Sequence, residues 1–529
     1  MILIYYKSKS VNILKANLPS YIFIMNKNFL KAMFCVTFFS VATRALGFIL
    51  KIYLSRNLGS VMLGSYQVAM SIFAVMMTFV SSGIPVVLSR NVSYYAGTNN
   101  KKSIGSIVSS GLIITGIICL IVSLIVILFP NILSLIFTSN ASAEMIYILL
   151  PALIFSSIYE VLRGALWGRK KFFIISITEF IEQVLRIVLL FILFNTTFIR
   201  ISPTNKTALS LSLACTISAI IVIIIYFKTN GNLSNPKYEF KNLLKESSPI
   251  TAIRTVSSIV SSIIAIIIPL RLQTFGYTST EALSEFGIIM GMTFPLLMIP
   301  GTLISSLAVT MVPSISEQSN NIDSGNLKNK SILKSKINFS IKTSILFSSI
   351  LISTFIALGV PICKLVFNNE KAGIYLSYAS IIMIPLGLSQ ITSSILNAIG
   401  LEMKSLKNYI VSSSILILSI IFLPKYFGTF ALIIGYFLMS LISAIMNVSM
   451  LAKRNLVSFG FLKTIFLLIL TNLISSCLGI LILNLLHFNL FINIIISAIF
   501  TLGSNILLIL CFNIANVKII IFNKKKNYA

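Results

Sequence analysis

Long apolar runs recur along nearly the whole chain of 529 residues, and short polar stretches separate them. Each run is about 20 residues or longer, which is the length that an α-helix needs to cross the hydrocarbon core of a bilayer and more than a barrel strand requires. Because lipid cannot satisfy backbone polar groups, spans of this length must be helical. The pattern therefore predicts an all-α polytopic membrane protein.

We expect about fourteen spans, taken from the runs in which few charges interrupt the apolar residues. The expected spans cover residues 29–54, 63–89, 104–129, 142–167, 173–195, 207–227, 249–274, 284–316, 337–360, 373–399, 405–424, 429–451, 461–486 and 489–515. The 284–316 run is longer than a bilayer requires and contains Pro295, Pro300 and Pro313, which predicts bends inside it. Such interruptions are tolerated where the backbone faces protein or a wet cavity.

The charge of the chain indicates its orientation. The sequence holds 41 Lys and Arg against 12 Asp and Glu, a formal net charge of +29. Most of the cations lie at the termini and in the loops that follow even-numbered spans, such as 169–171 and 453–454. By the positive-inside rule we expect both termini of this multi-pass cell-membrane protein in the cytoplasm, which agrees with an even number of spans. Since topology accounts for the cations, no nucleic-acid partner is expected.

A polar loop, KTNGNLSNPKYEFKNLLKES, divides the chain after six spans. Two helical bundles with the substrate between them are a common transporter plan. The segment MNKNFLKAMF makes Met25 a natural start, as an alternative to Met1. The expected organisation is an N-terminal extension (1–24), an N-terminal helical lobe of six helices (25–228), a cytoplasmic linker (229–248), a C-terminal six-helix lobe (249–455), and two appended helices with a basic cytoplasmic tail (456–529).

Several ionisable residues lie inside the spans, where each costs roughly 2.5 to 3.5 kcal/mol on insertion scales. Arg44 lies about 15 Å from the nearer end of its span, too far for its guanidinium to reach the headgroups easily. Small, polar and cationic residues recur every three or four positions on that helix, and a similar face on the seventh span carries Arg254. The first of these faces consists of Thr37, Ser40, Arg44, Gly47, Lys51 and Ser55. We expect both faces to line one inward cavity.

The fourth and fifth spans add carboxylates and two more arginines. Glu182 and Arg186 are spaced for an i,i+4 pair, and Glu160 precedes Arg163 by three residues, so both pairs can act as structural links between helices. No acid lies within a helical turn of Arg44, Lys51 or Arg254. Five deep cations against three carboxylates leave a surplus of two positive charges, which favours an anion, and guanidinium groups suit phosphate oxygens. The predicted substrate-binding residues are Arg44, Lys51, Arg254, Arg163 and Arg186, and Glu160, Glu179 and Glu182 are predicted to serve ion coupling or structural pairing.

Other chemistry is not indicated. The sequence has no GxxxxGK[ST] motif for a built-in nucleotide-driven pump, no CxxC pair, and a single histidine, His487. The outer loops offer few acids for catalysis. We therefore expect no enzyme activity, no catalytic residues, no metal site and no cofactor.

Several segments resemble the stage V sporulation protein B and polysaccharide biosynthesis exporter family. They are TRALGFILKIYLSRNLGSVMLGSYQVAMSIF, SSGIPVVLSR, RGALWGRKKF, ITEFIEQVLRIV, IIIPLRLQTFGYT and GMTFPLLMIPGTLISSLAVTMVPSISE. The resemblance runs from about Met25 to about Phe512 and places the chain in the superfamily of lipid II flippases and multidrug and toxin extrusion transporters. It implies two six-helix lobes that work by alternating access, and an undecaprenyl-pyrophosphate-linked saccharide as substrate. Arg44 matches a cavity arginine of the lipid II flippases, whereas Lys51 and Ile264 stand where relatives tend to have acids.

These observations lead to three functional hypotheses. The first is a flippase that moves a lipid-linked pyrophosphate glycan, such as a peptidoglycan precursor for the spore cortex, from the cytoplasmic to the outer leaflet, with membrane lipids and cell-wall synthesis enzymes as further partners. The second is an ion-coupled multidrug or cation exporter on the same scaffold, which would use buried acids such as Glu179 and Glu182. The third is a sporulation scaffold that transports nothing.

Overall fold

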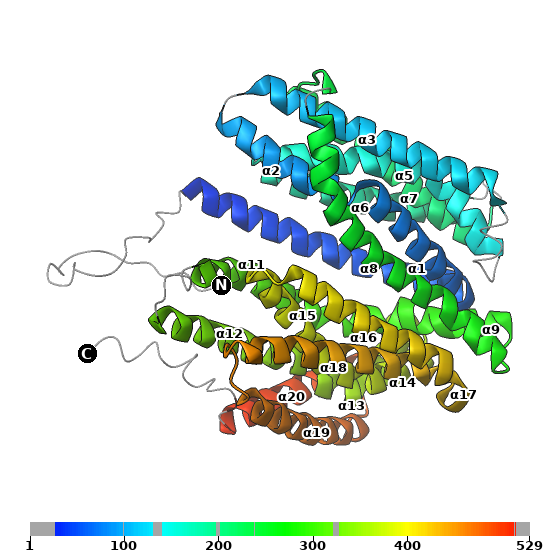
Figure 1. Ribbon diagram of the computed structural model, residues 1–529. Helices are drawn as coiled ribbons and strands as arrows, with labels where there is room; N and C mark the ends of the chain where they lie inside the picture. Colours follow the sequence, from blue (N-terminus) through cyan, green and yellow to red (C-terminus); the bar gives the residue numbers. More distant parts are fainter. Residues whose placement is uncertain are drawn as a thin grey trace.

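The computed structural model describes residues 27–98, 100–130, 140–196, 201–236, 239–320, 327–512 and 514, and every regular element in these ranges is a helix. The predicted N-terminal extension and almost all of the basic tail lie outside them. Two bundles of helices lie side by side, and the long helix α8 runs between them (Figure 1). The prediction of an all-α polytopic protein is confirmed.

The first bundle, here called the N-lobe, contains the first six predicted spans. Its longest element breaks at Gly59, whose φ of 71° and ψ of 174° are not helical, so α1 is a hairpin of two helices. The elements are α1 (Lys27–Ser81), α2 (Ile84–Gly97), α3 (Lys101–Leu128), α5 (Asn140–Gly168), α6 (Phe172–Asn195) and α7 (Pro203–Lys228).

The second bundle, here called the C-lobe, follows α8 (Phe240–Thr274). The predicted bends in the 284–316 run are present: a π-helical turn precedes Pro295 and a break at Met298 precedes Pro300, while α11 continues through residue 313. The elements are α9 (Ser279–Gly287), η2 (Ile288–Thr293), α10 (Phe294–Leu297), α11 (Ile299–Asn320), α12 (Leu327–Ser349), α13 (Ile352–Phe367), α14 (Glu370–Ala379), η3 (Ser380–Ile382), α15 (Met383–Ala398), α16 (Glu402–Phe422), α17 (Pro424–Phe427) and α18 (Phe430–Lys453).

Two further helices, α19 (Phe461–Leu485) and α20 (Leu490–Cys511), pack against α13 of the C-lobe. Buried amides hold them there. The Asn472 Oδ1 atom accepts from the Ser353 amide at 3.0 Å and from Asn505 Nδ2 at 3.0 Å. Because α13 starts anew after α12, its first amide groups have no partner within the helix, and Asn472 supplies one.

Eleven helical segments of the described chain are long and apolar enough to cross a membrane. One of them, Phe38–Gly97, includes the turn at Gly59 and therefore holds two crossings. The charged helix α6 and the broken run from α9 to α11, which correspond to the fifth and eighth predicted spans, are not among these eleven segments, so the number fourteen stays a prediction.

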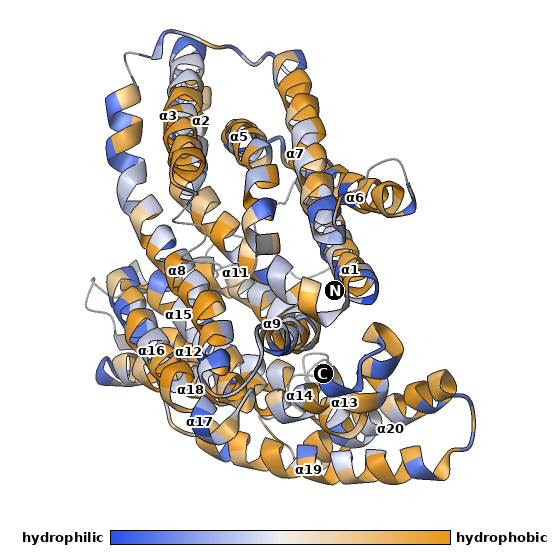
Figure 2. Ribbon diagram, turned by 90° about the vertical axis from the view of Figure 1, so that its right-hand side faces the viewer, coloured by the Kyte–Doolittle hydropathy of each residue, from blue (hydrophilic) through white to orange (hydrophobic). Residues whose placement is uncertain are grey.

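The helices expose apolar side chains, as expected for a protein in lipid, and bury small polar residues within a mainly apolar interior. The ribbon of the outer helix α19 is mostly hydrophobic in colour (Figure 2). Its Phe466 and Leu481 side chains are exposed. Small hydroxyl residues lie in the interior: Ser340, Ser344 and Ser348 of α12 are fully buried, and the Ser344 hydroxyl donates to the Gly387 carbonyl at 2.9 Å. Small residues allow helix backbones to approach closely where lipid provides no hydrophobic drive for association.

The α8 helix begins in the N-lobe and ends in the C-lobe. We call the end of the molecule where α1, α8 and α19 begin the basic end, and the end near Gly59 and α9 the opposite end (Figure 1). At the basic end, Glu246 of α8 pairs with Arg90 at 2.7 Å, and Tyr95 donates to Glu239 at 2.6 Å. Since α8 already begins at Phe240, the second half of the predicted 229–248 linker is helical. The bounds predicted for the two lobes stay a prediction.

Candidate functional site

A polar cavity of about 540 Å³ lies in the N-lobe where α2, α5 and α8 meet. We call it the charged cavity. Its charged groups are Arg254 from α8, and Glu160 and Arg163 from α5; Ser81, Ser82 and Ser89 add hydroxyls. The cavity thus brings together three of the eight charged residues predicted to form the site.

The position of Arg254 depends on the break between α1 and α2. The chain leaves the helix at Ser82 and Gly83, and the Ser82 carbonyl accepts from Arg254 Nη1 at 2.8 Å. A Cβ on Gly83 would lie 2.4 Å from the Ser247 carbonyl oxygen, so only glycine lets α8 approach this closely. The Thr251 hydroxyl then accepts from the Gly83 amide at 3.2 Å. No described carboxylate pairs with Arg254.

Two carboxylates, in contrast, bind Arg163. Its Nη1 lies 2.7 Å from Glu160, and its Nε lies 3.0 Å from Glu179 on the neighbouring helix α6. All three side chains are about one-third exposed, and Glu160 and Arg163 line the charged cavity. Glu160 and Arg163 are three residues apart in α5 and form an ion pair in the structure, while the role of Glu160 in ion coupling or structural pairing stays a prediction. The contact with Glu179 joins two helices and has no signal in local spacing.

The other predicted pair, Glu182 and Arg186, makes no direct ion pair in the described chain. Instead, Arg186 Nη2 donates to the Tyr66 hydroxyl of α1 at 2.7 Å, and the Cys215 thiol of α7 approaches Glu182 at 3.9 Å. The i,i+4 spacing permits a pair, but partners on neighbouring helices bind these groups. Tyr66 was not among the predicted site residues.

The predicted face of α1 lies toward α6. At Gly47, a Cβ would contact the Gln183 amide at 3.8 Å, and Lys51, one turn further on, lies within electrostatic range of Arg186. Arg44 and Lys51 are exposed, make no ion pair with a described residue, and do not line the charged cavity.

The charged side chains of the N-lobe differ in how they are paired. The carboxylates of Glu160 and Glu179 occupy the Arg163 guanidinium, while Arg254 has only a neutral carbonyl as partner and keeps N–H groups to donate. Arg44 and Lys51 add two unpaired cations on the same lobe. Guanidinium and ammonium groups with N–H groups left to donate favour an anion with several acceptor oxygens.

The lobes pack closely at the opposite end. There Ser284 of α9 donates to Ser60 at 2.7 Å, and Arg56 donates to the carbonyls of Leu365 and Val366 at the end of α13. Backbones nearly touch at a glycine pair: a Cβ on Gly64 would lie 2.0 Å from the Leu283 carbonyl oxygen, and one on Gly287 would lie 2.1 Å from that of Ser60.

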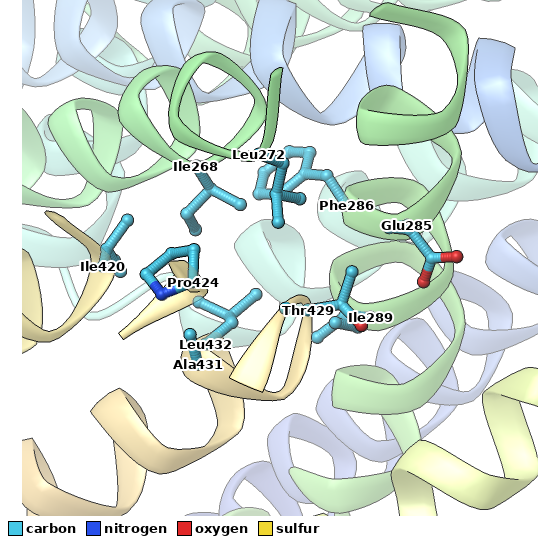
Figure 3. A pocket seen from close by; sticks show the side chains of 11 residues that line it. Ile268, Leu272, Glu285, Phe286, Ile289, Ile420, Pro424, Thr429, Ala431 and Leu432 are labelled. Carbon is cyan, nitrogen blue, oxygen red and sulfur yellow. The ribbon is translucent and has the colours of Figure 1, made fainter. Parts of the chain in front are cut away.

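A narrow pocket lies in the C-lobe near this contact (Figure 3). Its volume is about 10 Å³, about one water molecule, so it is too small for a substrate. Glu285 lies at its edge, where Lys371 and Tyr375 bind the carboxylate. This cluster fastens α14 to α9 and so supports the surface that the N-lobe contacts.

An apolar groove of about 570 Å³ separates α19 from α15 and α18. Aliphatic and aromatic side chains, such as Ile384, Phe437, Ile445 and Ile469, form nearly all of its lining. The groove can hold a hydrocarbon chain but offers almost nothing to a polar ligand.

Residues 29–319 match the polysaccharide biosynthesis protein family. Stage V sporulation protein B of Bacillus subtilis (strain 168) is 25% identical over 304 residues, which cover 55% of this chain and 58% of that protein. Sporulation protein YkvU of the same organism is 22% identical over 306 residues, covering 55% and 66%. The chain thus spans less than two thirds of the length of either relative.

Solved structures show the same fold. The lipid II flippase MurJ in an inward closed conformation has a TM-score of 0.68 at 18% identity, covering 91% of this chain and all of that one. An inward-facing multidrug resistance MATE family transporter of the MOP superfamily has a TM-score of 0.65 at 14% identity, covering 79% and 94%. These findings confirm the resemblance drawn from the sequence. The chain belongs to the polysaccharide biosynthesis protein family and is a multi-pass membrane protein with the fold of these solved structures.

Proposed function

We propose that this protein moves an undecaprenyl-pyrophosphate-linked glycan, similar to the peptidoglycan precursor lipid II, across the cytoplasmic membrane by alternating access. The observation that carries the proposal is the set of three cations in the spans, Arg44, Lys51 and Arg254, that have no described carboxylate partner. A pyrophosphate offers many acceptor oxygens and negative charge, which such cations bind well. Arg163 and Arg186 would act beside them, and Glu160, Glu179 and Glu182 would balance their charge.

The charged headgroup of such a lipid requires a polar environment, whereas its polyprenyl tail requires an apolar one. The headgroup would enter the charged cavity while the polyprenyl tail stays in an apolar environment, and the groove beside α19 has the lining that a hydrocarbon chain requires. This division lets a charged headgroup cross without drawing the tail into water.

The lobe contacts support alternating access. Lobe contacts at the opposite end close that side, and we place the basic end and both termini in the cytoplasm by the positive-inside rule. In this orientation the chain would accept its substrate from the cytoplasmic side. Release would need Ser60, Arg56 and Gly64 to part from the C-lobe, which a rocking of the two lobes achieves.

The names of two relatives, which are sporulation proteins, support a role in cell-wall or spore-cortex assembly. Cell-wall synthesis enzymes would then be the partners that supply and consume the lipid.

A direct test measures binding of undecaprenyl pyrophosphate to the purified protein in detergent. Arg254→Ala should weaken binding by about 10-fold or more, since a hydrogen bond to a charged group contributes roughly 1.5 to 3 kcal/mol. Arg90→Ala is the matched control, because Arg90 is an exposed arginine paired with Glu246 and lies outside the charged cavity. Equal affinity of the wild type and Arg254→Ala would refute the assignment.

Ion-coupled export of a small cation is the second candidate. Glu182 favours it, because this carboxylate is half-buried and makes no ion pair in the described chain. Under this alternative, Glu182→Gln would abolish proton- or sodium-driven dye efflux while leaving the affinity for undecaprenyl pyrophosphate unchanged.

A further inference from the structure

A second polar cavity, of about 480 Å³, lies in the C-lobe between α11, α15, α16 and α18. We call it the hydroxyl-lined cavity. Its polar lining includes Ser305, Ser389, Gln390, Ser393, Tyr409 and Tyr436. None of its lining residues carries a charge, in contrast to the arginines and glutamate of the charged cavity. Its chemistry therefore suits a neutral polar ligand.

Several polar groups of this cavity can still form hydrogen bonds with a ligand. The Gln390 side-chain oxygen is buried and has no hydrogen-bond partner in the described chain. An orphaned buried acceptor costs free energy that a ligand donor would recover. The Tyr436 hydroxyl also makes no hydrogen bond to a described residue, whereas Ser305 and Ser389 donate to carbonyls of their own helices and keep lone pairs. The cavity offers both donors and acceptors.

The cavity has room and a rigid aromatic wall. Gly301 lies beside Gln390, where a Cβ would come within 3.4 Å of the amide oxygen. The ring of Tyr436 packs against Phe294, with centroids 4.6 Å apart, and this contact fixes its orientation. A fixed tyrosine next to an amide and several hydroxyls can satisfy a ligand that carries many hydroxyl groups on an apolar ring.

The helix α8 joins the two cavities. Tyr409 donates to the Ser257 carbonyl of α8 at 3.5 Å, and Arg254, three residues earlier on α8, lines the charged cavity. Three residues of α-helix rise by only about 4.5 Å. The Arg254 position and the carbonyl that Tyr409 contacts therefore lie within about one turn of each other along the axis of α8.

We infer that the hydroxyl-lined cavity binds the saccharide of the transported lipid, with Gln390 and Tyr436 as its specificity-determining contacts. This inference rests on the proposed function, because it assumes that Arg254 holds the pyrophosphate of the same molecule. The N-lobe then recognises the phosphate, common to all such lipids, and the C-lobe discriminates between glycans. A coupling cation is a poorer occupant, since no carboxylate lines the cavity.

The test compares two probes, undecaprenyl pyrophosphate without sugar and lipid II, by their dissociation constants for the purified full chain. The variants are Gln390→Leu and Tyr436→Phe, which remove the polar groups and keep most of the volume. We expect the wild type to bind lipid II more tightly than undecaprenyl pyrophosphate. Each variant should bind lipid II roughly 3- to 10-fold more weakly, the range for loss of a neutral hydrogen bond, and should bind undecaprenyl pyrophosphate as the wild type does.

The control is Gln273→Leu, because Gln273 also has a buried amide nitrogen without a partner but lies outside the hydroxyl-lined cavity. Retained binding of undecaprenyl pyrophosphate shows that each variant is folded. Three outcomes would overturn the inference and leave the proposed function standing: both variants bind lipid II as the wild type does, the variants lose equal affinity for both probes, or the wild type does not prefer lipid II. A wild type that binds neither probe would overturn both.

Discussion

The glycine pair at the opposite end makes a quantitative prediction about the equilibrium between conformations. In Gly64→Ala, the new Cβ would lie 2.0 Å from the Leu283 backbone oxygen, whereas ordinary contact begins at 3.4 Å. The backbones must therefore separate by about 1.4 Å, and overpacking of this kind costs roughly 1 to 3 kcal/mol. Because only the conformation closed at this end contains the contact, the cost shifts the equilibrium away from it by about 5- to 150-fold.

Cross-linking between the lobes measures this shift. Cysteines in place of Ser60 and Ser284, whose hydroxyl oxygens lie 2.7 Å apart, are joined by a short thiol cross-linker in proteoliposomes. The exposed Cys477 and Cys511 are first replaced by serine. Gly116→Ala is the control, since a Cβ there meets nothing within 4 Å. We expect Gly64→Ala to cross-link much more slowly than the control; equal rates would refute the reasoning that this contact closes the opposite end.

Three further predictions concern stability and binding. Asn472→Leu removes the acceptor of the buried Ser353 amide and should lower the free energy of unfolding in detergent by about 1 to 3 kcal/mol. The Thr278 amide and hydroxyl both donate to the Glu281 carboxylate and lower its pKa below the ordinary value of 4.5. The stabilisation from this cap is therefore present above pH 4.5 and is lost as the pH falls through the lowered pKa. Glu281→Gln should remove this acid-dependent part of the melting temperature. Gly83→Ala should separate α8 from the α1–α2 break and weaken undecaprenyl pyrophosphate binding several-fold, as measured by titration.

Matched variants check the first and third of these results. Asn195→Leu changes an exposed asparagine at the end of α6 and should leave the unfolding free energy nearly unchanged. Gly97→Ala adds a Cβ that meets nothing within 4 Å and should bind the lipid normally. Each assigned role has an outcome that contradicts it. For the Asn472 contact, the outcome is an Asn472→Leu protein as stable as the wild type. For the Glu281 cap it is an unaltered acid dependence in Glu281→Gln, and for Gly83 it is normal lipid binding by Gly83→Ala.

Hydropathy predicted the helices well, because lipid imposes both their length and their apolar surface. The predicted span 142–167 corresponds to Asn140–Gly168, and 173–195 corresponds to Phe172–Asn195. The α6 helix was predicted despite its charges, since apolar residues flank Glu179 and Glu182 in the sequence. The turn at Gly59 lies within the gap left between the first two predicted spans.

The partners of the charged residues were harder to predict, because they lie on different helices. Local spacing gave the contact of Glu160 with Arg163 within α5, but it gave neither the contact of Arg163 with Glu179 nor that of Arg186 with Tyr66. Those depend on how α1, α5 and α6 pack, which the period of a single helix does not encode.

The hydroxyl-lined cavity left no signal in the sequence. Serine, glutamine and tyrosine occur throughout the spans, where small polar residues usually serve helix packing. Only the convergence of α11, α15, α16 and α18 shows that Gln390 and Tyr436 share one cavity. Neutral sites of this kind escape a search that looks for charges in the membrane.

Transbilayer movement of lipid II in proteoliposomes containing the purified protein tests the central claim most directly. Our account predicts that the wild type moves lipid II between leaflets faster than protein-free vesicles, that Arg254→Ala moves it much more slowly, and that Arg90→Ala resembles the wild type. Movement no faster than in protein-free vesicles, or equal rates for the wild type and Arg254→Ala, would contradict it.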